Sequence, residues 1–171
     1  MINFREKQYM RIPVLWAVLL GVGILLLYGN YRQIVRGEMF GNQPMSDIGL
    51  IIFTTIYFVF IFAFSRTNLL VEVGEEGVLF RYYPFHLKYK KIAFNEIETA
   101  EIREFKPLAE FGGWGIRGNS KSSAYTVSGK KCVEFHLKGK KSILIGTLRQ
   151  DEFAKALRSA GVLVSHTDFH K

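Results

Sequence analysis

Residues 48–65 read IGLIIFTTIYFVFIFAFS, eighteen positions without a charge between Asp47 and Arg66. A helix of that length spans roughly 27 Å at 1.5 Å per residue, close to the ~30 Å hydrocarbon core of a bilayer. The β-branched and aromatic content would also suit a buried strand. Strands usually run about 3–10 residues, however, and no Gly, Pro or Asn interrupts residues 50–65. The stretch therefore predicts a transmembrane helix.

A second apolar run precedes it and follows a short basic N-terminus, residues 1–11. Residues 12–31 carry no charge, and residues 12–28 are the apolar part. A cleaved signal peptide has an apolar region of about 7–15 residues followed by a small-x-small site. This run instead ends in Tyr28-Gly29-Asn30-Tyr31. We therefore expect a second membrane helix that is retained.

The polar connection between the two runs, residues 29–47, predicts a hairpin whose ends lie on one side of the membrane. Lys and Arg accumulate on the cytoplasmic side of membrane helices. The connection contains Arg32 and Arg36, whereas residues 1–11 contain three basic residues and the chain after the second helix is Lys-rich. The single Cys132 gives no sign of an oxidising compartment. We expect a multi-pass protein of the cytoplasmic (inner) membrane with both termini cytoplasmic.

From Asn68 onward the hydrophobic period changes to two, which is typical of half-buried strands. Leu69, Val71 and Val73 alternate with other residues, and the acidic stretch 74–77 reads as a turn. Seven short strands are predicted, near residues 69–73, 78–82, 86–94, 96–105, 124–127, 132–137 and 142–146.

The last predicted element is an amphipathic helix. Residues 147–150 have capping-box spacing, Phe153, Ala156 and Leu157 share one face, and Gly161 follows as a stop signal. Seven strands followed by one such helix predict a strongly bent β-sandwich whose open end the helix covers.

Four stretches carry a family resemblance: FGGWGIR (111–117), AYTVSG (124–129), VEFHL (133–137) and ILIGT (143–147). Together with the order of elements, they make the chain similar to bacterial pleckstrin-homology-like (PH-like) membrane proteins with two N-terminal transmembrane helices. The resemblance implies a non-enzymatic module without a cofactor, often self-associating. It does not imply inositol-phosphate binding, because the turn at residues 74–77, where phosphoinositide-binding PH domains are basic, is acidic here.

The expected architecture is therefore α+β. Residues 1–66 form a two-helix transmembrane hairpin with helices near 12–28 and 48–65. Residues 67–164 form a PH-like seven-stranded bent β-sandwich or barrel with a C-terminal capping helix. Residues 165–171 form a tail.

Cys132, Glu134 and His136 alternate along one predicted strand and resemble a catalytic or metal-binding set. Residues two apart in a strand are nearly 7 Å apart and residues four apart about 13 Å, so these side chains cannot converge on one atom. We expect them on a solvent-facing surface. His166 and His170 have the spacing of a helical metal site but fall in the predicted tail. No catalytic residue, metal site or cofactor is expected, and the protein is predicted not to be an enzyme.

Basic residues are concentrated in residues 65–171, which hold eighteen Lys and Arg against twelve Asp and Glu. The candidate contacts to an anionic surface are Lys88, Lys90, Lys91, Lys138, Lys140 and Lys141. We expect these lysines at the end of the domain where the first strand begins, with the acidic turn at the opposite end. Because aromatic platforms are not interleaved with the charges, nucleic acid is not an expected partner.

The predicted function is a membrane-anchored, non-catalytic interaction module on the cytoplasmic face that binds protein or peptide. Its expected partners are the lipid bilayer, in which it is integral, and either a second copy or another membrane protein. Trp114 is the candidate partner contact, and a tryptophan at the edge of the core is the favoured alternative for it. The alternative is a membrane-surface domain that senses anionic lipid through its lysines.

Overall fold

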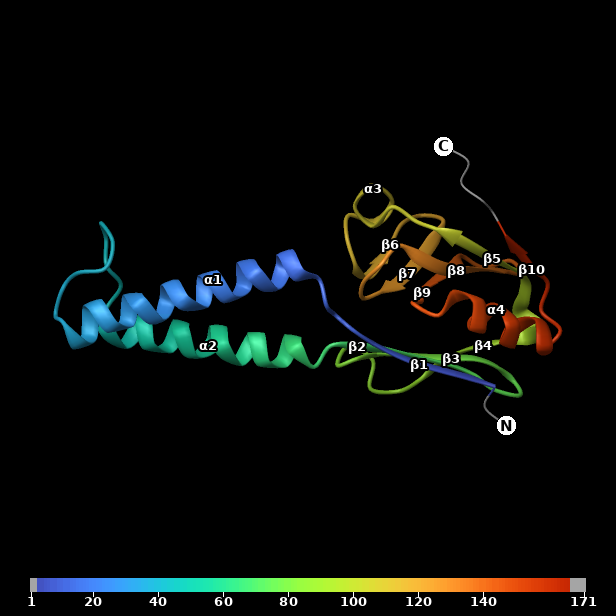
Figure 1. Cartoon of the computed structure of the whole chain (residues 1–171), viewed down its shortest axis with the longest axis horizontal. Coiled ribbons are helices and arrows are strands. Elements are labelled where there is room, and N and C mark those ends of the chain that lie inside the picture. Colours follow the sequence, from blue (N-terminus) through green and yellow to red (C-terminus); the bar gives the residue numbers. More distant parts are fainter. Residues whose placement is uncertain (1–2, 167–171) are drawn as a thin grey trace. The chain divides into compact units, whose positions relative to one another are not determined.

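A computed structural model describes residues 3–166 and shows a mixed α+β protein with two compact units (Figure 1). One unit is helical and comprises residues 11–66. The other contains both sheets and combines residues 3–10 with residues 67–166. The helical hairpin is therefore an insertion in the β-rich unit, rather than a segment that precedes it.

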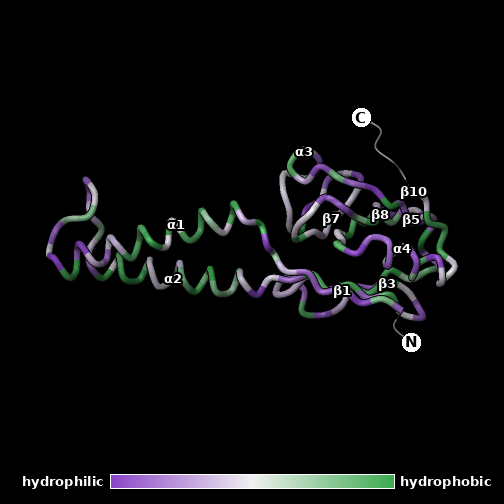
Figure 2. The backbone as a smooth tube through the Cα atoms, in the orientation of Figure 1, coloured by the Kyte–Doolittle hydropathy of each residue, from purple (hydrophilic) through white to green (hydrophobic). Residues whose placement is uncertain are grey.

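The helical unit contains α1 (Pro13–Asn30), which continues into the π-helical turn η1 (Tyr31–Val35), and α2 (Asp47–Ser65). The Ser46 hydroxyl caps α2 by accepting a hydrogen bond from the Gly49 amide. Both helices are apolar along their length (Figure 2). Residues 13–35 and 47–65 are each long and apolar enough to cross a membrane.

The two helices pack as an antiparallel pair through a few polar contacts. The Tyr57 hydroxyl donates to the Leu19 carbonyl at 2.6 Å, and the Asn30 amide donates to the Thr54 hydroxyl at 2.7 Å. Gly23 faces Phe58 and Tyr57 of α2, and a Cβ added there would lie 3.4 Å from the Phe58 ring, in ordinary van der Waals contact.

The first sheet is antiparallel and contains β1 (Phe4–Tyr9), β2 (Asn68–Val73), β3 (Gly77–Tyr83) and β4 (Lys90–Ala93) in that order. Strand β1 corrects the expectation that residues 1–66 form only the hairpin. Its alternate residues Phe4, Glu6 and Gln8 are buried. Because Glu6 and Gln8 are polar, the sequence lacks the alternation of apolar and polar residues that identifies a half-buried strand.

The second sheet has the order β10-β5-β8-β9-β7-β6. Its strands are β5 (Ile97–Glu104), β6 (Gly115–Gly118), β7 (Ser122–Thr126), β8 (Lys131–Leu137), β9 (Ser142–Gly146) and β10 (Val164–His166). Strand β10 pairs in parallel with β5, so residues 165 and 166 belong to the sheet and not to a tail. The rest of the predicted tail lies outside the described residues.

No closed barrel forms within residues 3–166, and the expectation of seven strands is also wrong, because ten strands form two separate sheets. The 3₁₀ turn η2 (Phe94–Glu96) separates β4 from β5, and these strands do not pair. The rings of Phe80 and Tyr125 meet between the sheets, with centroids 4.8 Å apart.

Two further helices complete the β-rich unit. Helix α4 (Gln150–Ser159) inserts Phe153, which is fully buried between Phe4 and Phe135. Helix α3 (Pro107–Phe111) is a short turn on the outer face of the second sheet. The predicted capping box at residues 147–150 is wrong: α4 starts at Gln150 after Arg149, and the Thr147 hydroxyl accepts from the Arg149 amide and donates to Glu6.

Candidate functional site

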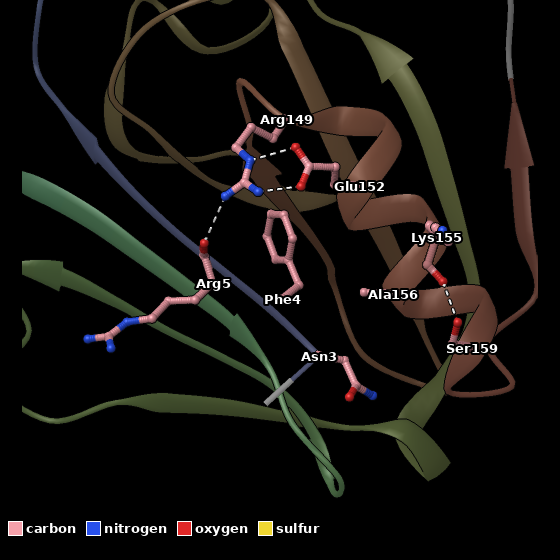
Figure 3. Close-up of a pocket in the computed structure, with 8 residues that line it drawn as sticks. All are labelled: Asn3, Phe4, Arg5, Arg149, Glu152, Lys155, Ala156 and Ser159. Carbon is pink, nitrogen blue, oxygen red and sulfur yellow. Dashed lines mark hydrogen bonds and ion pairs between the residues drawn. The ribbon is translucent and has the colours of Figure 1, made fainter. Parts of the chain in front are cut away.

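A pocket of about 610 Å³ lies between the edge strand β1 and helix α4 (Figure 3). Its lining comes from three residues of β1 and its N-terminal flank, from four of α4, and from the residue before that helix. These are Asn3, Phe4, Arg5, Arg149, Glu152, Lys155, Ala156 and Ser159.

Phe4 and Ala156 form the apolar part of this pocket, and Phe4 is held there by a buried ring behind it. Phe4 lies parallel to Phe153 with ring centroids 4.9 Å apart, and the Arg149 guanidinium lies 5.5 Å from the centre of the Phe4 ring. Arg149 also donates through Nε to Glu152 at 2.7 Å and through Nη1 to the Arg5 carbonyl at 3.1 Å. The pocket therefore combines an apolar wall with an ordered charged rim.

The backbone of β1 is an available sheet edge. Strand β1 pairs with β2 on one side only, and its other side is the end of the sheet. The Met10 amide donates to the Thr67 carbonyl, so Met10 directs its backbone groups toward β2. In an antiparallel pair every second residue does so, and the residues between them direct their backbone groups to the opposite side. The backbone groups of Arg5 and Lys7 therefore point away from β2, and Arg149 already uses the Arg5 carbonyl from that side.

A buried polar seam, made of Glu6, Gln8 and residues 146–148, holds β1 beside α4. The Glu6 carboxylate accepts hydrogen bonds from the Thr147 hydroxyl at 2.6 Å and from the Leu148 amide at 2.9 Å. The Gln8 side-chain amide donates to the Gly146 carbonyl at 2.8 Å. Because both side chains are buried, these bonds fix the position of β1 and with it the width of the pocket.

The lysines predicted to contact an anionic surface do not gather at the end where β2 begins. Strand β4 pairs Ala93 with Gly77, so η2 and the start of β5 lie at the end of the acidic 74–77 turn. The Lys138 amide bonds the Glu96 carbonyl, which places the turn 138–141 at this same end. The expected separation of acid from base is therefore wrong.

Four of these lysines have partners on the protein, three of them side chains and one, for Lys141, a backbone carbonyl. Lys91 pairs with Glu76, and Lys140 lies 2.6 Å from Glu96. Each hydrogen bond lowers the pKa of its carboxyl. Lys90 donates to the Tyr125 hydroxyl at 3.0 Å and also lies over its ring.

Lys141 and the remaining candidate lysines are exposed. Lys141 donates to the Asn119 carbonyl at 3.2 Å. Lys88 lies in the loop between β3 and β4, and Lys138 lies in the turn after β8.

Trp114, the candidate partner contact, is half-buried. Its indole N–H donates to the Gly129 carbonyl at 2.8 Å, and its ring packs against a cluster that includes Phe105 and Cys132. Trp114 therefore helps to close the outer face of the second sheet.

Cys132, Glu134 and His136 share one face of β8, but they do not form a common solvent-exposed surface. The segment around α3 covers Cys132 completely, and burial raises the pKa of its thiol to about 12. Glu134 is also buried and accepts from Arg103 Nε at 2.7 Å. The prediction failed because a loop distant in sequence covers the start of this strand face.

His136 lies in a hydrogen-bonded chain across three strands. Its Nδ1 is 3.0 Å from the Ser142 hydroxyl, and its Nε2 is 3.2 Å from the Glu101 carboxylate. The chain orients an imidazole that is 40% exposed. It contains the residue types of a hydrolytic triad, but on the outer face of the sheet and apart from the pocket described above.

No group of three His, Cys, Asp or Glu side chains suited to a metal ion occurs within residues 3–166. His166 instead lies 2.8 Å from Arg158. The second histidine of the predicted pair, His170, is outside the described residues.

These features define a two-sheet α+β protein with an inserted apolar helical hairpin and a pocket beside its edge strand. Residues 1–164 match the model of a family of unknown function, DUF6141, and the chain belongs to this family. A comparison with curated proteins finds no match.

Proposed function

We propose that this protein is a membrane-anchored, non-catalytic interaction module whose PH-like domain binds an extended acidic segment of a partner protein. The segment adds a strand to the free edge of β1 and places side chains in the pocket beside α4. The free edge of β1 next to that pocket is the observation that carries the proposal.

The helical unit supports anchoring in a bilayer. The core helix of a soluble protein is mostly buried, whereas only 11% of the apolar window of each helix is buried in this protein. Polar side chains in the two helices are satisfied locally: Asn30 bonds Leu26 and Thr54, and Tyr57 bonds Leu19. Such satisfaction is what a helix requires in a medium without water.

The distribution of basic residues supports cytoplasmic termini. Arg11 and Arg66 flank the helix ends that connect to β1 and β2. The connection between the helices has Arg32 and Arg36, and both form ion pairs with Glu38. The lysine-rich β unit lies on the Arg11 and Arg66 side of the hairpin, as the positive-inside rule favours for a cytoplasmic domain.

The β-rich unit supports the PH-like part of the proposal. Two sheets enclose one core, and a single C-terminal helix supplies Phe153 to it. A C-terminal helix packed on a two-sheet core agrees with the family resemblance, whereas β1 and β10 have no counterpart in the expected order of elements.

Strand addition explains why the edge and the pocket adjoin. In this recognition mode, main-chain hydrogen bonds give affinity and pockets for alternate side chains give specificity. The backbone of Lys7, which points away from β2, offers main-chain hydrogen bonds, and the pocket beside Phe4 receives a side chain of the segment. The buried seam pre-organises both, which reduces the entropy lost on binding.

The charge of the pocket selects the partner. Among its charged lining residues, Arg149 pairs with Glu152 and Arg5 pairs with Glu72 of β2 at 2.9 Å, so Lys155 supplies the remaining positive charge. A net positive rim attracts acidic peptides and disfavours basic ones.

Binding of a fluorescent eight-residue peptide of alternating Val and Glu to the full chain in nanodiscs tests the proposal. We expect Lys155→Glu to weaken binding roughly tenfold, an effect of about 1.4 kcal/mol. The matched control is Lys138→Glu, the same charge reversal in an exposed turn, which should leave binding nearly unchanged. We also expect the Lys7 amide to gain protection from hydrogen exchange in the complex. Equal losses in both variants, or no binding by the wild type, would reject the groove as the binding site.

A further inference from the structure

We infer that residues 84–89, here called the interface loop, form a second membrane contact that inserts Phe85 and Leu87 into an anionic leaflet. This inference rests on the membrane-anchoring part of the proposed function but is independent of peptide binding. The observations that carry it are the register of β3, the exposure of the loop's apolar side chains and the order of the loop itself.

Chain length and the register of β3 limit how far the start of this loop can lie from the end of α2. Helix α2 ends at Ser65 and β2 begins at Asn68, which directly faces Tyr83, the last residue of β3. Three Cα–Cα steps of 3.8 Å separate Ser65 from Asn68, so these residues are at most roughly 11 Å apart. The Cα atoms of the paired residues Asn68 and Tyr83 are about a further 5 Å apart.

Together these lengths allow at most roughly 16 Å between Ser65 and Tyr83, so the interface loop can reach the membrane interface. The polar headgroup region extends roughly 5–8 Å beyond each side of the hydrocarbon core. When α2 spans the core, Ser65 lies at its boundary, so the first residues of the interface loop are within reach of the headgroups. Arg66, whose guanidinium lies 4.8 Å from the centre of the Phe62 ring, marks the same level.

The interface loop exposes apolar side chains that nothing in residues 3–166 covers. Phe85 is 69% exposed and Leu87 is 75% exposed, and Lys88 follows directly. Large apolar side chains alternating with lysine are suited to a surface that offers acyl chains next to phosphates.

Contacts at both ends of the loop hold its backbone, so its apolar side chains stay exposed to solvent. The His86 amide donates to the Tyr82 carbonyl at 2.7 Å, and the Phe85 ring lies 6.0 Å from the Tyr82 ring. At the other end, the Arg81 guanidinium lies 5.0 Å from the centre of the Tyr89 ring. Phe85 and Leu87 therefore point outward from a loop that is held at both ends.

Two tyrosines next to the loop fit the same interface. Tyr9 and Tyr83 both face Asn68, one from each neighbouring strand. They are 40% and 39% exposed. Tyrosine is enriched at the level of the headgroups, where its ring is partly apolar and its hydroxyl is hydrated. The row Tyr9–Asn68–Tyr83 thus extends the proposed contact across three strands.

Depth-dependent quenching in the full chain tests this inference. A fluorescent label is placed at Leu87→Cys or at Leu163→Cys, both in a Cys132→Ala background, and the protein is reconstituted in nanodiscs of phosphatidylglycerol and phosphatidylcholine. Leu163 is the matched control, because it is also a leucine, is 73% exposed and precedes β10. We expect a shallow doxyl-lipid quencher to reduce fluorescence at position 87 at least twofold more than at position 163. Equal quenching at the two positions would overturn the inference.

Two further samples separate the causes of each outcome. A label at Val59→Cys, in the middle of α2, reports whether the hairpin is inserted, since a deep quencher must reach it. If the deep quencher does not reach Val59→Cys, membrane anchoring fails and the interface loop fails with it. If it does, the Phe85→Ser variant labelled at position 87 should lose at least half of its excess quenching. Retention of the full quenching would show that the label alone, and not the loop, enters the lipid.

Discussion

The Glu6 carboxylate accepts a 2.6 Å hydrogen bond from the Thr147 hydroxyl, across 141 positions of sequence. Glu6 precedes the helical hairpin, and Thr147 lies just before the last helix. The bond shows that the β-rich unit is assembled from both sides of the hairpin. The two connections to the hairpin lie on neighbouring strands, since Tyr9 of β1 pairs with Asn68 of β2.

We predict that the hairpin can be removed if β1 is kept. Residues 3–10 joined through Asn-Gly to residues 67–166 should fold, because the Met10–Thr67 hydrogen bond closes a two-residue hairpin loop there. A fragment that starts at residue 66 lacks β1 and should be less stable and prone to association through β2. Urea unfolding and light scattering of the two proteins check this. Equal stability of the two would mean that β1 contributes little.

Replacing Glu6 by Ala should destabilise the excised domain by roughly 2–3 kcal/mol, because the Leu148 amide and the Thr147 hydroxyl lose their acceptor. The control is Glu98→Ala, which alters an exposed residue of β5 and should change stability by less than about 0.5 kcal/mol. Similar urea midpoints for the two variants would contradict the importance of the buried seam.

The turn between β2 and β3 requires glycine at one of its two positions. A Cβ at Gly77 would lie 2.2 Å from the Ile92 carbonyl oxygen, and its φ of +152° is also unfavourable for other residues. We expect Gly77→Ala to cost more than about 3 kcal/mol or to prevent folding. Gly74→Ala should be almost neutral, since its nearest neighbour is 4.0 Å away. Thermal unfolding by circular dichroism compares the pair, and equal melting temperatures would refute the steric argument.

The domain should lose stability in alkali through two buried groups. Burial raises the pKa of Cys132 from 9.0 to about 12 and that of Tyr82 from 10.0 to about 12. As the pH rises above about 9, the unfolded chain loses the thiol proton while the folded chain keeps it. The free energy of unfolding therefore falls by roughly 1.4 kcal/mol per pH unit, and Tyr82 increases the slope above about pH 10.

Urea titrations of the excised domain between pH 8 and 11 measure this slope. Between pH 9 and 10, where the thiol contributes most of the slope, the Cys132→Ala variant should keep only the decline due to Tyr82, which is about a third of that due to the thiol. A decline of equal steepness in the variant would assign the effect to another group. At neutral pH we also expect the wild-type thiol to react with a maleimide only after unfolding.

The proposed orientation of the hairpin predicts which surfaces are accessible in intact cells. Single cysteines at Asn42, between the helices, and at Ser165, in β10, are introduced in the Cys132→Ala background. An impermeant maleimide should label position 42 and not position 165. The reverse pattern would place the β-rich unit outside the cytoplasm.

Much of the fold follows from local pattern. Residues 48–65 have no charge and too great a length for a strand, and α2 occupies Asp47–Ser65. The alternation of Leu69, Val71 and Val73 identifies β2, because the buried face of a strand recurs every second residue. In α4, Phe153 and Leu157 are buried because they lie four positions apart on one helix face.

Only the tertiary structure decided where β1, the groove and the cover of Cys132 lie. Residues 4–9 alternate, but Glu6 and Gln8 become core residues only because partners near residue 147 satisfy their polar groups. Cys132 is buried because the segment 105–114 returns over β8. The charge pattern likewise depended on strand order, since η2 brings Glu96 next to Lys140. Local sequence determines periodicity, whereas burial and pairing depend on which distant segment packs against each face.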